Sequence, residues 1–143
     1  MKIVSLLSVL LLVYGVSSDT IFRANGTLTC KYHWPTWCFT IQWWEQDVSF
    51  LLNMDDLIAT QGGICRQTDT VDYSIQGSQD WDGINDDFFE TQIEINHNCT
   101  YSGVRRVARV PMFTRVGTPE VFVTFDADVT HMGDKVSDYF KAH

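Results

Sequence analysis

Apolar and polar residues alternate along several short segments of this chain, and no other sequence feature constrains the fold as strongly. Successive side chains of a β-strand point to opposite faces of a sheet, so strict alternation predicts strands with one buried and one solvated face. The alternating segments are Thr27–Tyr32, Phe39–Trp44, Val71–Gly77, Ile93–Asn96, Val104–Met112 and Val121–Phe125. Turn-forming residues separate them at 34–36, 61–63, 81–83, 102–103 and 117–119. About seven short strands with such turns predict an all-β antiparallel sandwich.

Two segments do not follow this period. Residues 47–60 carry apolar side chains without alternation, which indicates either a short helical turn or a covered loop. Residues Asp134–Lys141 are the one helix candidate, at a terminus that frays easily. Because 143 residues hold a single domain, we expect one sandwich over residues 19–143 with a short, helical or frayed C-terminal tail.

The N-terminal segment has the features of an export signal. Lys2 precedes an apolar run over Ile3–Val13, and the small residues Gly15, Ser17 and Ser18 follow it. This order predicts a signal peptide over residues 1–18, and the run is too short to span a bilayer comfortably. The alternative is an uncleaved anchor. Cleavage before Asp19 would leave a secreted, extracellular protein.

The charge balance excludes some partners. The chain has 18 acidic and 10 basic residues, a net charge of −8, which argues against binding to nucleic acid or nonspecifically to anionic membranes. The exception is a basic cluster of Arg105, Arg106, Arg109 and Arg115. This cluster indicates either a solvated strand face or a docking patch for an anionic partner.

The cysteines and two glycosylation sequons fit an exported protein. Four cysteines, Cys30, Cys38, Cys65 and Cys99, predict two disulfides, with three possible connectivities and no zinc-site spacing. Asn25-Gly26-Thr27 and Asn98-Cys99-Thr100 are glycosylation sequons. Asn25 is the better site, because a disulfide at Cys99 would hinder modification of Asn98.

Two candidates for site chemistry each have a simpler interpretation. His97 would need an unnamed partner to act as a general base, and a structural histidine bonded to a neighbouring strand is the favoured interpretation. The acidic segment Asp80–Asp87 carries several oxygen ligands of the kind calcium prefers, but its spacing is not that of an EF-hand. We interpret it as a solvated loop and expect no metal.

The tryptophans divide between core and surface. Trp43 shares a face with Phe39 and Ile41 and is expected in the core. Trp44 should face outward unless another segment covers it. Together with Trp34 and Trp37 it would form an exposed aromatic patch, or residues 48–60 would cover all three.

The order of motifs resembles the transthyretin-like family of secreted nematode proteins. The resemblance spans about residues 26–126, and no single motif is specific on its own. It rests on Gly26-Thr27-Leu28-Thr29-Cys30, Phe39-x-Ile41-x-Trp43-x-Glu45-Gln46-Asp47, Asp55-Asp56-Leu57, Thr68-Asp69, Tyr73-Ser74-Ile75-Gln76-Gly77 and Ile95-Asn96-His97-Asn98-Cys99.

This resemblance implies a transthyretin-type (prealbumin-type) sandwich and a disulfide pairing. It implies Cys30–Cys99 as the family pair and Cys38–Cys65 as an additional bridge. It says less about activity, because relatives by fold include a hormone carrier and a 5-hydroxyisourate hydrolase, and fold alone does not assign function. The hydrolase uses a C-terminal Y-R-G-S sequence, which this chain lacks.

We therefore expect a non-enzymatic, secreted binding protein. It would act as a ligand or bridging factor for an extracellular or cell-surface protein or lipid partner, without a cofactor. The candidate binding surface consists of Arg105, Arg106, Arg109 and Trp44. A carrier of a small hydrophobic ligand is the alternative, and a hydrolase is a remote one.

Overall fold

All the regular elements of the described residues are β-strands. The computed structural model describes residues 19–32, 36–46, 55–80 and 87–136, so the predicted signal peptide lies outside the described residues. The strands are β1 Thr20–Thr29, β2 Trp37–Glu45, β3 Asp56–Arg66, β4 Thr70–Gln79, β5 Phe88–His97, β6 Arg106–Arg115, β7 Glu120–Thr124, β8 Ala127–Asp128 and β9 Asp134–Lys135. In this part of the chain, no helix has the length and apolar character that crossing a membrane requires.

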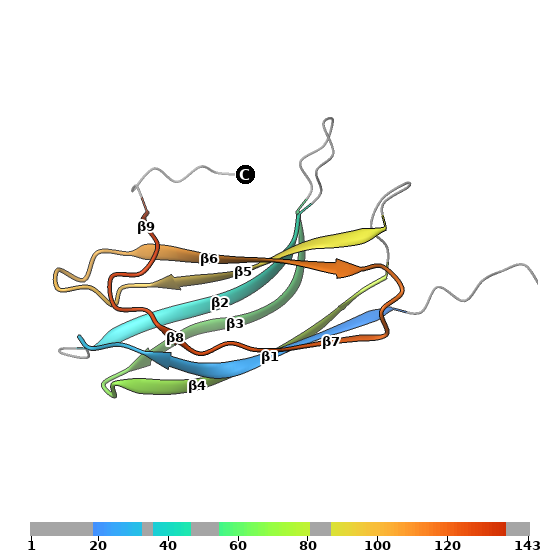
Figure 1. Cartoon of the computed structure of the whole chain (residues 1–143). Helices are drawn as coiled ribbons and strands as arrows, with labels where there is room; N and C mark the ends of the chain where they lie inside the picture. Colours follow the sequence, from blue (N-terminus) through green and yellow to red (C-terminus); the bar gives the residue numbers. More distant parts are fainter. Residues whose placement is uncertain (1–18, 33–35, 47–54, 81–86, 137–143) are drawn as a thin grey trace, which may run out of the picture.

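The strands form two sheets that pack face to face as a sandwich (Figure 1). The five-stranded sheet has the order β3-β2-β5-β6-β9, with antiparallel neighbours throughout. In the four-stranded sheet, β1 is central, antiparallel to β4 and parallel to both β7 and β8. The predicted all-β sandwich is thus confirmed, but the pairing of β1 with β7 and β8 is parallel.

The core lies between the sheets and contains the residues that the alternation assigned to it. Trp43 is fully buried, as predicted, and its ring meets Phe22 edge-on at 5.3 Å between centroids. Phe22 in turn meets Phe89 at 5.6 Å, which links β1 to β5 across the interior. Trp37 is also buried, where it stacks on Phe39 and donates a hydrogen bond to the Thr68 carbonyl at 2.9 Å. It therefore does not belong to an exposed aromatic patch.

Three local expectations were wrong. Gln61-Gly62-Gly63 is not a turn, because it lies within β3, where two register shifts against β2 accommodate the irregular sequence. Residues 47–60 were expected to form a helical turn or a covered loop, but Asp56–Thr60 belong to strand β3. Residues 47–54 lie outside the described residues. Asp134–Lys135 is a short strand on the edge of β6 and does not begin a helix.

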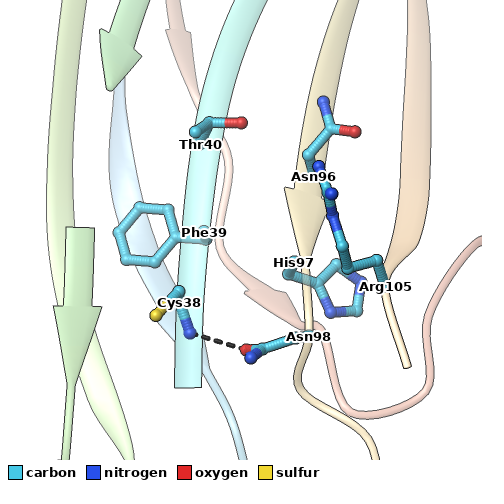
Figure 2. A pocket seen from close by; sticks show the side chains of 7 residues that line it. All are labelled: Cys38, Phe39, Thr40, Asn96, His97, Asn98 and Arg105. Atoms are coloured by element: carbon cyan, nitrogen blue, oxygen red, sulfur yellow. Dashed lines mark hydrogen bonds between the residues drawn. The ribbon is translucent and has the colours of Figure 1, made fainter. Parts of the chain in front are cut away.

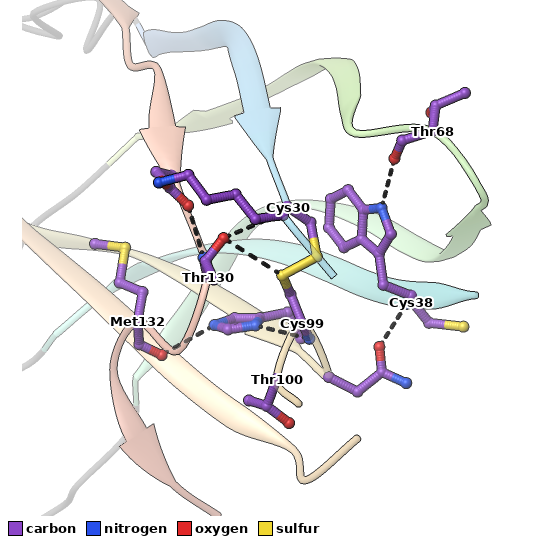
Figure 3. The surroundings of a disulfide bond; sticks show 12 residues. Cys30, Cys38, Thr68, Cys99, Thr100, Thr130 and Met132 are labelled. Carbon is purple, nitrogen blue, oxygen red and sulfur yellow. Dashed lines mark hydrogen bonds and ion pairs between the residues drawn. A yellow bond between two sulfur atoms is a disulfide. The ribbon is translucent and has the colours of Figure 1, made fainter. Parts of the chain in front are cut away.

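The two disulfides connect the chain in different ways. Cys30–Cys99 is fully buried and ties the end of β1 to the residues after β5, so it joins the two sheets (Figure 3). Cys38–Cys65 joins directly opposite residues of β2 and β3 within one sheet and lies at the surface. These are the pairs that the resemblance implied. Two disulfides indicate an oxidising environment.

The four-stranded sheet is interrupted between β7 and β8. Phe125 and Asp126 leave the strand there, and the Thr27 N–H donates to the Asp126 carboxylate at 2.7 Å. The Tyr73 hydroxyl donates to the Phe125 carbonyl at 2.8 Å, and burial together with the Asp126 charge raises the pKa of Tyr73 to about 12. Gly26 lies directly beneath this carbonyl, where a Cβ atom would come within 2.1 Å of the Phe125 oxygen.

Candidate binding site on the outer face of the five-stranded sheet

A hollow lined by both polar and apolar groups lies on the outer face of the five-stranded sheet, at the end nearest the disulfides (Figure 2). It encloses about 180 Å³. Side chains on the exposed faces of β2 and β5 form its floor, and the residue preceding β6 forms its rim. The lining residues are Cys38, Phe39, Thr40, Asn96, His97, Asn98 and Arg105.

Asn98 is held in one orientation by β2. The Asn98 N–H donates to the Cys38 carbonyl at 3.1 Å, and the Cys38 N–H donates to Asn98 Oδ1 at 2.6 Å (Figure 2). Because Oδ1 is engaged by the backbone, the amide nitrogen Nδ2 is the atom left to interact with a ligand. The amide of Asn98 is therefore a preorganised hydrogen-bond donor.

Arg105 supplies the positive charge of the hollow. A turn over Thr100–Gly103 precedes it, and its carbonyl accepts a hydrogen bond from Val136 N–H at 3.0 Å, which anchors the backbone. The guanidinium is exposed, and within the described ranges it forms no ion pair or hydrogen bond. It is thus available to an anionic group.

The other predicted surface arginines are already engaged. Arg106 donates from Nε to the carbonyls of Met132 and Gly133, at 3.2 and 2.9 Å, and so fastens the C-terminal segment to the sheet. Arg109 pairs with Glu94 at 2.8 Å and with Asp134 at 3.6 Å. The arginine cluster is therefore not one surface, since only Arg105 belongs to the hollow.

An apolar band occupies the opposite end of the same face. We define it as Trp44, Leu57, Phe88, Pro111 and Phe113, which lie on four adjacent strands. Trp44 is directly opposite Leu57 in the β2–β3 pairing. Gln92 of β5 lies between Trp44 and Pro111, because it pairs with Trp44 on one side and with Pro111 on the other. Leu57, Phe88 and Phe113 are 45%, 48% and 74% exposed, while Trp44 is half-buried. Of the predicted surface residues, only Trp44 lies in this band.

His97 has the structural role that the sequence favoured. Its side chain is buried, Nδ1 accepts the Cys99 N–H at 3.2 Å, and Nε2 lies 3.0 Å from the Met132 carbonyl. This pattern requires a neutral ring with the proton on Nε2. Burial lowers the pKa of His97, the positive charges of Arg106 and His131 lower it further, and the bond to Met132 opposes these effects.

The His97 environment predicts a pH-dependent stability. Because the folded pKa lies below the ordinary value of 6.5, the unfolded chain binds more protons as the pH falls. The contribution of His97 is complete above pH 6.5 and is lost progressively below it. Urea unfolding followed by tryptophan fluorescence should show a falling free energy of unfolding below that pH. His97→Gln should flatten this part of the profile, whereas the exposed His131→Gln, which removes only the smallest of the effects on the His97 pKa, should change it much less; equal profiles for all three proteins would contradict the assignment.

The two sequons lie in different environments. Asn25 is exposed in the middle of β1, and among the described residues its side chain has one hydrogen bond, from the Thr124 hydroxyl to Oδ1 at 3.3 Å. Asn98 is half-buried in the hollow, and both Cys99 and Thr100 of its sequon are buried. A transferase needs an accessible, extended acceptor, so the structure favours Asn25.

We predict a single N-glycan, at Asn25. Intact mass measured before and after enzymatic deglycosylation of the protein secreted from eukaryotic cells should show one glycan. Asn25→Gln should remove it and Asn98→Gln should leave it unchanged. Glycan on the Asn25→Gln protein would show that Asn98 is modified.

No cluster of three or more metal-ligating side chains occurs among the described residues. The acidic segment considered as a calcium site falls mostly outside them, at residues 81–86. Sequence reasoning missed Thr40 and Asn96 in the hollow and Leu57 and Phe113 in the band. The alternation could have predicted that the side chains of Thr40 and Asn96 face outward. It could not have predicted that they lie near Arg105, because that depends on the order of the strands in the sheet.

Two packed sheets and two disulfides define the class of the protein as an all-β, disulfide-bonded sandwich. The chain belongs to the family described as Caenorhabditis elegans protein of unknown function (DUF870), which it matches over residues 25–138. It is 35% identical over 85 residues to uncharacterized protein B0416.7 of Caenorhabditis elegans, covering 59% of this chain. The match spans 60% of the length of that relative. No solved structure matches the chain.

Proposed function

We propose that this protein is a secreted, non-enzymatic binding protein with a transthyretin-type sandwich, acting as a ligand or bridging factor for an extracellular or cell-surface protein. The apolar band on the outer face of the five-stranded sheet carries this proposal. Single exposed apolar residues are ordinary, but a group spread over four neighbouring strands is typical of an interaction surface. Phe113 is its most exposed aromatic side chain, at 74%.

The composition of the band fits a protein partner. Aromatic residues are enriched at protein interfaces, and a half-buried tryptophan beside exposed phenylalanines provides large contact areas with few rotatable bonds. Polar groups border the band, including the paired Arg109 and Glu94, which supply the hydrated rim that such interfaces have. The two disulfides and the N-terminal sequence support secretion, and the motif order and the sandwich architecture support the transthyretin-like assignment.

Phe113 and Phe122 lie on the outer faces of the two different sheets, and comparing their substitution tests the proposal. Labelled mature protein is incubated with intact nematode tissue and extracellular matrix, and the bound fraction is measured as a function of concentration. Phe113→Ser combined with Leu57→Ser should reduce saturable binding by about tenfold or more, since interface anchors contribute ~1–2 kcal/mol each. The matched control is Phe122→Ser, which removes a 63% exposed phenylalanine from the outer face of the other sheet.

The outcomes separate the proposal from its alternative. Equal loss of binding in both variants, or unchanged binding in the Phe113 and Leu57 variant, would contradict the role of the band. Light scattering on the same proteins gives the oligomeric state. A tetramer that the Phe113 and Leu57 variant dissociates would show that the band joins copies of the chain, and would favour the carrier of a small hydrophobic ligand instead.

A further inference from the structure

We infer that Arg105 and Asn98 in the hollow bind a carboxylate, supplied by an acidic side chain of the polypeptide partner. This inference rests on the proposed function and deepens it. In this arrangement, the charge of the hollow selects the partner, and the apolar band provides most of the contact area.

Two groups available in the hollow, the Arg105 guanidinium and Asn98 Nδ2, can only donate hydrogen bonds. The Arg105 guanidinium has no partner among the described residues, and the backbone of β2 directs Asn98 Nδ2 away from its own Oδ1 contact. The Thr40 hydroxyl also has no partner in the described part of the chain. In Figure 2 the Arg105 side chain extends along β5 toward Asn96, while Thr40 lies on the neighbouring strand β2 and Asn98 lies near Cys38. The Asn96 amide donates to Gln42 Oε1 at 3.5 Å, so its Oδ1 is an acceptor on the floor. A guanidinium without an ion-pair partner beside a free amide donor nevertheless favours an anion.

The charge of the site favours a carboxylate over a dianion. A guanidinium matches the two oxygens of a carboxylate with parallel hydrogen bonds, and one cation neutralises one negative charge. The chain as a whole carries −8, and Arg106 and Arg109 are committed to Gly133 and Glu94. A phosphate or sulfate dianion would therefore be left with uncompensated charge in a negative field.

The position of the hollow allows one partner to occupy both sites. Asn98, which lines the hollow, directly follows β5, and Gln92, which lies between Trp44 and Pro111 of the band, is six residues before it. At about 3.3 Å per residue, the two sites are separated by roughly 20 Å along one face. An interface of ordinary size covers this distance.

Titration of the disulfide-bonded protein, produced without N-glycans, tests the site without the partner. The probe is N-acetyl-aspartyl amide, with N-acetyl-asparaginyl amide as the neutral analogue and inorganic phosphate as the dianion. In ¹⁵N-resolved NMR spectra, the aspartyl probe should shift the backbone amides of Thr40 and Asn98 and the Nε–H of Arg105. Arg105→Gln should weaken this binding roughly tenfold, as expected for loss of a charge-assisted pair. Arg115→Gln, which alters an exposed arginine at the other end of β6, should leave it unchanged.

Three results would overturn the inference: no saturable shifts at these residues, equal shifts with the neutral analogue, or stronger binding of phosphate. The well-dispersed spectrum of each variant verifies folding, and Arg105→Lys should retain part of the binding because it keeps the charge. The variant with Phe113→Ser and Leu57→Ser should bind the probe normally. Separate variants and separate measurements therefore distinguish a wrong inference about the hollow from a wrong proposal about the apolar band.

Discussion

Replacing both Cys30 and Cys99 with alanine is expected to lower the free energy of unfolding by about 4 kcal/mol. The bridge spans 69 positions of sequence, and the chain-entropy treatment of a loop of that length gives about this value. Both sulfur atoms lie in fully buried residues between the sheets, so the substitution also vacates core volume. Alanine avoids placing an unpaired hydroxyl there. Urea unfolding followed by tryptophan fluorescence measures the change.

The second disulfide provides the matched control. Cys38–Cys65 spans 27 positions, is exposed at β3, and joins strands that already pair along their length. Replacing both of these cysteines with alanine should therefore destabilise the protein less, because the loop is shorter and no core volume is lost. A larger effect for this pair than for Cys30 and Cys99 would contradict the assignment of the buried bridge as the main covalent tie.

Substitution of Gly26 by alanine is expected to cost roughly 3 kcal/mol, the upper part of the range for overpacking a tightly packed site. The new Cβ would lie 2.1 Å from the Phe125 oxygen and 2.7 Å from its carbon, and both are backbone atoms that cannot rotate away. Displacing this carbonyl would also disturb its hydrogen bond from Tyr73.

Gly62→Ala is the control for the intrinsic effect of removing a glycine. Gly62 lies in β3 with no atom within 4 Å of a built Cβ, so alanine there should change stability little. Thermal or urea unfolding compares the two variants. Similar midpoints for Gly26→Ala and Gly62→Ala would show that β1 does not need close approach at Phe125.

The alternation predicted most of the strands because burial of one face imposes a period of two. It correctly placed Trp43 in the core and His97 in a structural role. It missed β3 entirely, since the strand is shifted twice in register and its paired glycines resemble a turn, and it placed the start of β1 at Thr27 although the strand begins at Thr20. Pro111 was expected near a strand end, but β6 continues through it, because β9 pairs only with Arg106 and Val107 and leaves that edge open among the described residues.

The candidate site was predictable only in part. Arg105, Arg106 and Arg109 are close in sequence, yet Arg106 is bound to the C-terminal segment and Arg109 to Glu94. An arginine is engaged only where a carbonyl or carboxylate group lies near it, and those groups come from distant strands that pair with its own. The local sequence therefore does not show which arginine remains free. The hollow likewise combines residues 38–40 with residues 96–105, a juxtaposition that follows from strand order and not from local pattern.

The parallel contact between β1 and β7 has a consequence for biosynthesis. Thr27 and Asp126, which hydrogen-bond across this region, are 99 positions apart, and β1 is the central strand of its sheet. In Figure 1 the first strand and β7 lie side by side although they belong to opposite ends of the described chain. During synthesis, β1 therefore cannot complete its sheet until β7 and β8 have also left the ribosome. Such long-range closure makes folding slow and leaves an unpaired apolar strand exposed during synthesis, which a chaperone would need to shield.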